Sequence, residues 1–117
     1  MATIQWTRTD PKYGVMQHSV VLGAGDSSTD LTIPDYSDKT VHAFATSFGN
    51  SAISVKGLNT TDGTAQDLHR VNDPTTTFTS LSSETLALLL ENPTILRVST
   101  SGTTGTGLTV VIVSKRN

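Results

Sequence analysis

Ile53-Ser54-Val55-Lys56-Gly57, followed by Leu58-Asn59-Thr60-Thr61-Asp62-Gly63, is the stretch that decides the fold class of this chain. The first five residues alternate apolar and polar side chains, which predicts a β-strand, and the following Asn, Asp and Gly residues predict a turn. A second strand is expected at residues 67–71. Strand, Gly/Asx turn and strand is the pattern of an antiparallel hairpin.

The same strand-and-turn pattern recurs along the chain. Further strands are expected at residues 4–8, 19–22, 30–33, 40–46, 76–79, 95–99 and 108–113, with turn signals at Asp10-Pro11, residues 23–26 and Pro34-Asp35. These are roughly eight or nine short strands at intervals of about ten residues, and no helical crossovers separate them. We therefore predict an all-β fold, an antiparallel β-sandwich with a jelly-roll-like arrangement.

Two of the predicted strands indicate how side chains divide between the faces of a sheet. In residues 40–46, Val41, Ala43 and Ala45 share one face, and His42 and Phe44 lie on the other. Phe44 and Phe48 are nevertheless expected to pack inside. In residues 108–113, Val110 and its neighbours on both faces are apolar. A strand that is apolar on both faces is either central in its sheet or covered by a partner.

One segment departs from the strand pattern. Residues 80–90 begin with serines of the kind that cap helices and continue with strong helix formers, and Asn92-Pro93 would end a helix there. We predict at most one short helix, between Ser82 and Leu88. A strand at residues 86–90 is the alternative.

Composition indicates one domain spanning residues 1–117. Charged residues make up 15% of the chain, and serine and threonine together supply about three residues in ten. The net charge of −2 gives no basic surface for nucleic acid or for a polybasic membrane contact.

Because cysteine is absent, stability without disulfides points to a reducing cytosol or to assembly. No signal peptide is recognised and the apolar run from Leu86 to Leu90 is too short to cross a bilayer, so synthesis in a cytoplasm is expected.

The residues that most often carry chemistry give no catalytic or metal pattern. His18, His42 and His69 lack metal-ligand spacing, and aspartates such as Asp26 fall in turns, where they bond their own backbone. Residues 102–107 superficially match a glycine-rich phosphate loop. A β-strand and not a helix follows them, which indicates a hairpin loop. We expect no enzyme, no cofactor, no metal site and no small-molecule ligand.

The N-terminal segment from Met1 to Tyr13 is the candidate for contact with a partner. Ile4, Trp6, Arg8 and Tyr13 include the aromatic and arginine types that are enriched in interfaces. The alternative is that residues 4–8 form an ordinary first strand, with Trp6 in the core.

Residues 33–116, about two-thirds of the chain, resemble small structural proteins encoded among the head genes of tailed bacteriophages, including capsid decoration (cement) proteins. The residues that carry the resemblance are Pro34, Tyr36, Asp38, Thr40 and Val41; Phe48 and Gly49; Gly57, Asn59, Asp62 and Gly63; Glu91, Asn92, Pro93 and Arg97; and the glycine-rich loop and strand at 105–110. Leu68 stands where relatives often carry tryptophan, Thr94-Ile95 replaces an Arg-Tyr pair, and the 57–63 turn is longer.

The resemblance implies a virion protein on the capsid exterior. It would bind the major capsid protein and stabilise the shell, as a homotrimer, without contact to nucleic acid or membrane. The same hairpin-and-arginine layout is also similar to discoidin-like carbohydrate-binding jelly rolls. The alternative is therefore a carbohydrate- or receptor-binding module of a phage tail or fibre.

Overall fold

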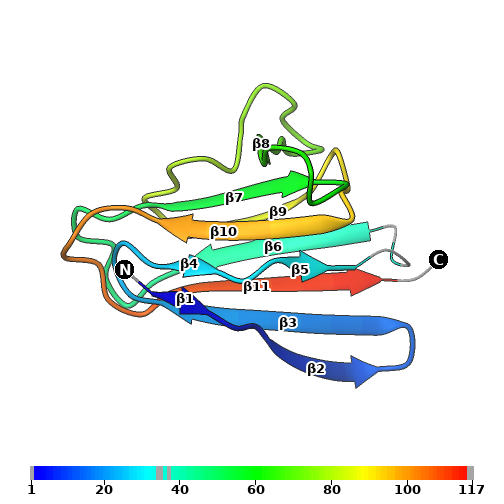
Figure 1. Cartoon of the computed structure of the whole chain (residues 1–117), viewed down its shortest axis with the longest axis horizontal. Coiled ribbons are helices and arrows are strands. Elements are labelled where there is room, and N and C mark those ends of the chain that lie inside the picture. Colours follow the sequence, from blue (N-terminus) through cyan, green and yellow to red (C-terminus); the bar gives the residue numbers. More distant parts are fainter. Residues whose placement is uncertain (1, 34–35, 37, 116–117) are drawn as a thin grey trace.

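Two β-sheets packed face to face form the protein (Figure 1), as described by a computed structural model for residues 2–33, 36 and 38–115. The five-stranded sheet has the order β2 (Thr7–Lys12), β3 (Val15–Leu22), β11 (Leu108–Lys115), β6 (Asp38–Phe44) and β9 (Thr85–Leu88). The six-stranded sheet has the order β1 (Thr3–Ile4), β4 (Ser27–Ser28), β10 (Ile95–Thr100), β7 (Ile53–Leu58) and β8 (Gln66–Asp67), with β5 (Leu31–Thr32) also on β10.

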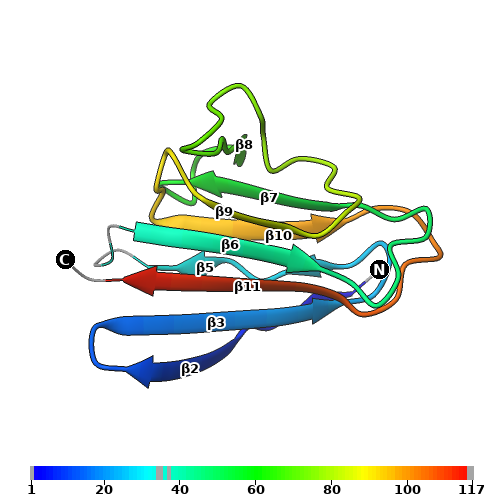
Figure 2. The same cartoon turned by 180° about the vertical axis from the view of Figure 1, so that it is seen from behind.

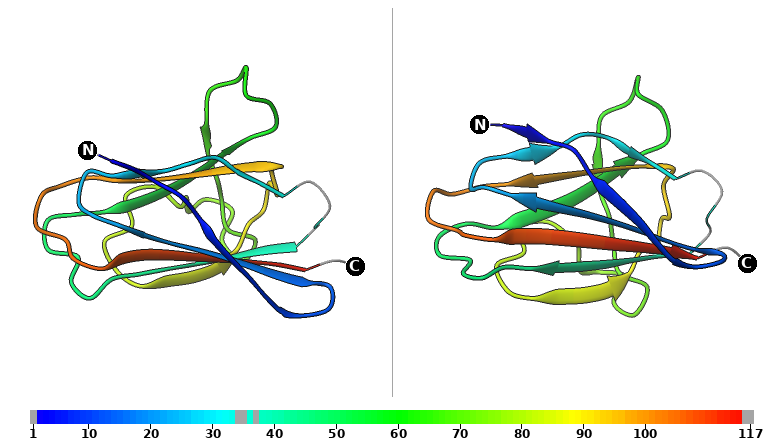
Figure 3. Two further views of the ribbon diagram at one scale, coloured as in Figure 1. Left: turned by 60° about the horizontal axis from the view of Figure 1, so that its bottom comes forward. Right: turned by 90° about the horizontal axis from the view of Figure 1, so that it is seen from below.

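The predicted antiparallel β-sandwich is confirmed. All strand pairs are antiparallel except β1 with β4, and the chain passes between the two sheets at most of its connections. The predicted hairpin of β7 and β8 is also present, with Lys56 opposite Asp67 and Gly57 opposite Gln66. The segment that follows β8 rises above the rest of the molecule in Figure 1, whereas the loop that joins β7 and β8 protrudes at the top of Figure 3.

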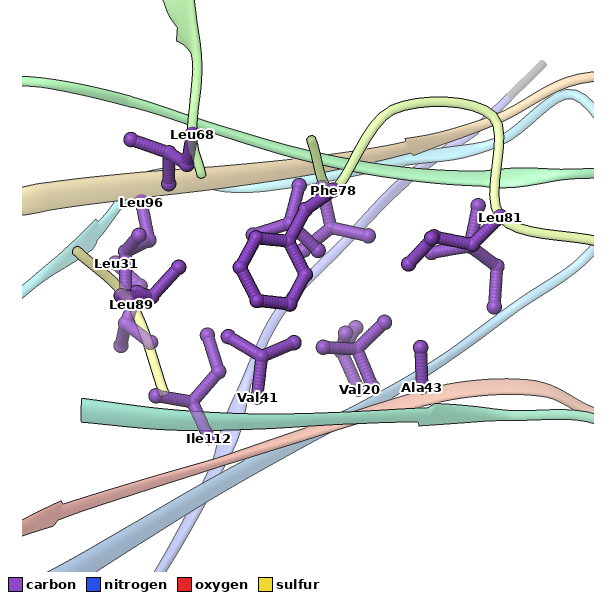
Figure 4. Close-up of a cluster of buried hydrophobic side chains, with 14 of the residues drawn as sticks. Val20, Leu31, Val41, Ala43, Leu68, Phe78, Leu81, Leu89, Leu96 and Ile112 are labelled. Atoms are coloured by element: carbon purple, nitrogen blue, oxygen red, sulfur yellow. The ribbon is translucent and has the colours of Figure 1, made fainter. Parts of the chain in front are cut away.

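The core lies between the two sheets, around Phe78. Its ring sits between the layers in Figure 4, with Leu68 on one side and Val41 on the other. Phe78 comes from a loop and not from a strand. Its N–H donates to the carbonyl of Leu68, and its own carbonyl accepts from the N–H of Val55. The strands predicted at 67–71 and 76–79 are therefore reduced to β8 and isolated bridges such as His69 with Thr77.

The helix predicted between Ser82 and Leu88 is wrong. Residues Thr85–Leu88 form the edge strand β9, paired with β6 so that Leu86 lies opposite His42 and Ala87 opposite Val41. The described residues contain no helix. Helix-forming side chains give only a weak preference, and pairing with β6 places Ala87 on the core, so tertiary contacts decide the conformation.

The strand predicted at residues 4–8 is also wrong, because it is divided between the sheets. β1 pairs with β4 in the six-stranded sheet, whereas β2 pairs with β3 in the five-stranded sheet. Asp10-Pro11, predicted as a turn, lies inside β2 at a register irregularity, and an edge strand tolerates the proline there. The turn falls at Tyr13-Gly14, where Gly14 has φ of 78°. The predicted Pro34-Asp35 turn lies outside the described residues.

The loop at residues 102–107 does not close a hairpin, because β10 and β11 belong to different sheets. Figure 3 shows this loop beside the loop that precedes β7. Asn50 joins the two: its Oδ1 accepts hydrogen bonds from the N–H groups of Thr103 and Thr104, each at 2.9 Å. Gly102 has φ of 79°, and a Cβ there would collide with Asn50, so glycine is required at this crossing.

Candidate binding surface

Strand β11 occupies the centre of the five-stranded sheet, between β3 and β6. Of the two alternatives left open by its apolar faces, a central position or cover by a partner, the structure shows the central position. Its even-numbered residues, such as Val110 and Ile112, are buried in the core. Because side chains alternate along a strand, Val111 and Val113 lie on the opposite, outer face, where they are half-buried.

Apolar side chains from four adjacent strands gather on this outer side of the five-stranded sheet. We call the set the outer apolar face, and it consists of Val21, Phe44, Leu86, Leu88, Val111 and Val113. The strand register makes the face continuous, because His42 lies opposite both Leu86 and Val111 and Thr109 lies opposite Val21. Figure 2 shows β9, β6, β11 and β3 following one another across this sheet. Leu86 and Val21 are 65% and 60% exposed.

The middle of the outer apolar face carries one ionisable side chain, His42. Its ring lies 4.8 Å from the ring of Phe44, and its Nε2 is 2.6 Å from Oε2 of Glu84. On β6 and β11 the charged outward residues, Asp38 and Lys115, stand at the ends of the strands. Such a surface is suited to bind a largely apolar partner.

Phe44 was expected to pack inside, and this is wrong. It alternates with Val41 and Ala43, which are fully buried, and so points away from the core. Phe48 is partly buried against the core, as expected. The outward position of Phe44 was already implied by its shared parity with His42 in the sequence.

The outer side of the six-stranded sheet differs in character. Its outward positions on β7 and β10 include Ser54, Lys56, Arg97 and Ser99. Arg97 makes two hydrogen bonds with Asp30, Nε to Oδ1 at 2.8 Å and Nη2 to Oδ2 at 3.2 Å, and these lower the pKa of Asp30. This side is therefore polar and internally paired.

The four residues predicted to contact a partner are not brought together. Ile4 and Trp6 pack against the core, and Trp6 Nε1 donates to the carbonyl of Thr29 at 2.9 Å. Arg8 pairs with Asp10 at 3.0 Å on the surface of β2. Tyr13, at the tip of the β2–β3 hairpin, is 97% exposed. Of the four, Arg8 and Tyr13 are exposed, whereas Ile4 and Trp6 are half-buried.

A second surface feature is an open depression of about 410 Å³ beneath the β7–β8 hairpin. Its lining includes Asn59, Gln66, Asp67, Glu91 and Pro93, and none of its lining residues is aromatic. Both carboxylate oxygens of Glu91 accept hydrogen bonds from His69, one from the backbone and one from the ring. Although partial burial opposes ionisation, these bonds lower the pKa of Glu91.

The other histidines and acids give no metal centre. His18 is buried on the inner side of β3, its pKa is lowered by burial, and its Nδ1 has no hydrogen-bond partner among the residues that the structure describes. Within residues 2–33, 36 and 38–115, no group of three or more His, Asp or Glu side chains is placed to hold a metal ion. The same residues include no helix long and apolar enough to span a membrane.

Several residues of the turn segments singled out in the sequence hold loops in place. Asn59 Oδ1 accepts a hydrogen bond from the N–H of Thr94 at 3.1 Å, and a Cβ on Gly57 would overlap Pro93. Asn92 has φ of 48°, a conformation that asparagine tolerates better than most residues. Compared by sequence, the chain matches no family model and no curated protein.

Proposed function

We propose that the protein is a structural component of a phage virion, a decoration or cement protein that binds the outside of the capsid through its outer apolar face. The observation that carries the proposal is the exposure of Leu86 and Val21 beside half-buried Val111 in one continuous, nearly uncharged surface. Burying one such aliphatic side chain contributes about 1.5–3 kcal/mol.

The choice of a capsid as partner rests on the resemblance of residues 33–116 to head decoration proteins. A shell displays many identical sites, so a modest affinity at each site adds up over the whole particle. A homotrimer at a symmetry axis would contact several capsid subunits at once. The outer apolar face would then lie against the shell, and the polar side of the six-stranded sheet would face solvent.

The test is binding of the purified protein to expanded capsids that lack decoration, followed by imaging of the particles. We expect ordered density on the shell, with the five-stranded sheet toward the capsid. Failure to bind, together with a signal on a glycan array, would overturn the proposal in favour of a carbohydrate-binding module that uses the depression beneath the β7–β8 hairpin. Binding through the six-stranded sheet would overturn the assignment of the face.

A further inference from the structure

A buried lysine lies inside the sandwich. Lys39, on β6, is 1% exposed, and its Nζ donates hydrogen bonds to the carbonyl of Tyr36 at 2.8 Å and to Oδ1 of Asn92 at 2.7 Å. Among the described residues no carboxylate forms an ion pair with it. This arrangement could not be anticipated from the sequence, because lysine is almost never fully buried in proteins.

The buried environment raises the share of Lys39 that is in the neutral amine form, compared with a lysine in water. A buried ammonium loses its hydration, which is costly when no counter-ion compensates, and the part of the chain that the structure describes supplies none. Burial accordingly lowers the pKa of Lys39. A neutral lysine amine is a nucleophile, whereas the ammonium form is not.

The amide of Asn92 is held within reach of that amine. The Cγ–Oδ1 bond of an amide is about 1.23 Å long, so Nζ lies within about 4 Å of Cγ. Lys39 is fixed by its pairing in β6, and its carbonyl accepts the N–H of Leu89 at 3.0 Å, which ties down the segment leading to Asn92. Such fixed proximity accelerates reactions between groups that react slowly in water, and effective molarities reach about 10⁵–10⁸ M.

We propose that Lys39 and Asn92 join in an intramolecular isopeptide bond. The Nζ lone pair attacks Cγ of Asn92, forming a new C–N bond. The Cγ–Nδ2 bond then breaks, one proton moves from Nζ to Nδ2, and ammonia leaves. The products are one secondary amide and one ammonia molecule, so atoms and charge balance without an oxidant or cofactor.

The bond would link two elements that are distant in sequence. It connects β6 to the turn between β9 and β10, across a separation of 53 residues. A cross-link of this kind restricts the unfolded chain in the way that a disulfide does, and this chain contains no cysteine. The inference concerns the interior of the sandwich and does not depend on what the outer apolar face binds.

The test is the intact mass of the purified full-length chain under denaturing conditions. We expect a mass about 17 Da below the sequence value, after allowance for any loss of Met1, because ammonia has left. A tryptic digest should contain one linked pair of peptides that includes residues 39 and 92, since trypsin does not cleave after an acylated lysine. A wild-type chain of full sequence mass, unchanged after prolonged incubation, would overturn the proposal.

Variants assign the bond to this pair. Lys39→Met removes the amine, Asn92→Gly removes the amide while allowing the positive φ, and both should restore the full mass. Lys56→Met, which alters a lysine on the outer side of the six-stranded sheet, should keep the deficit and serves as the matched control. A deficit that persists in Lys39→Met would show that ammonia is lost elsewhere and would equally overturn the assignment.

Discussion

On the six-stranded sheet the outward aliphatic side chains Leu58 and Ile95 are 7% and 6% exposed, whereas on the five-stranded sheet the outward Leu86 and Val21 are 65% and 60% exposed. Leu58 and Ile95 lie opposite each other in the register of β7 and β10, and the protein's own chain covers them. The outer apolar face has no such cover in the described residues. The two sides therefore differ in one respect. Folding of the chain buries the outward aliphatic side chains of the six-stranded sheet, whereas those of the outer apolar face stay exposed unless another molecule covers them.

Truncating one aliphatic residue on each side should give the largest difference in stability. Ile95→Ala is expected to lower the free energy of unfolding by about 2–5 kcal/mol, because it removes buried surface and leaves a cavity. Leu86→Ala is expected to change it by less than about 0.5 kcal/mol, because that side chain is already hydrated. Urea denaturation of both variants measures the contrast. Similar costs at the two positions would mean that the two sides are equally covered.

A lysine introduced on the outer side of one sheet should affect capsid affinity very differently from a lysine introduced on the other. Leu86→Lys should weaken capsid binding about 100-fold, or about 2.7 kcal/mol, because an unpaired ammonium would be buried in an apolar contact. Thr32→Lys, at an exposed outward position on β5, is the matched control and should bind within about threefold of wild type. Affinity for undecorated capsids, measured at fixed salt concentration, provides the comparison. The reverse order of effects would place the partner on the six-stranded sheet.

The fold was predictable wherever local pattern and tertiary contacts agree. The β7–β8 hairpin and the central position of β11 follow from turn residues and from an alternation that the structure confirms. The division of residues 4–8 was not predictable, because Thr3 pairs with Ser27 and Thr7 with Ser19, and nothing local distinguishes these partners. Register between strands that are distant in sequence is decided by packing and not by propensity.

The binding surface was less predictable than the fold. It exists only because β9 and β6 lie side by side, and residues 85–88 have a composition that favours a helix. Pairing with β6 turns Leu86 and Leu88 outward. The sequence carries little signal for this, because the exposed residues of Thr85–Leu88 are the two leucines and the half-buried ones are Thr85 and Ala87, the reverse of the usual pattern. The buried Lys39 had no signal at all.

Removing an ion pair from the outer side of the six-stranded sheet should have a smaller effect on the free energy of unfolding. Asp30→Asn removes the charged partner of Arg97 and should cost about 0.2–1 kcal/mol, because both side chains remain partly hydrated. The loss should shrink at about 1 M salt, where charges are screened. Lys56→Gln, which removes a single longer contact of 3.4 Å to Asp67, is the control and should cost less. A loss that is independent of salt would point to packing and not to charge.

The smallest expected effect concerns His18, on the inner side of the sheet that carries the outer apolar face. Burial lowers its pKa below 6.5, the neighbouring Arg8 lowers it further, and Asp10 opposes the shift. Below about pH 6.5 the unfolded chain therefore binds more protons than the folded chain, so the free energy of unfolding should fall as the pH drops from 7 to 5.

Urea denaturation across that range, compared between wild type and His18→Leu, isolates this contribution. The variant should lose less stability on acidification. His42→Leu alters the histidine on the outer apolar face and controls for the removal of a histidine from the same sheet. His18 Nδ1 is buried and has no hydrogen-bond partner among the described residues, so the His18 substitution should flatten the profile. Equal acid sensitivity of wild type and His18→Leu would show that folding does not lower the pKa of His18.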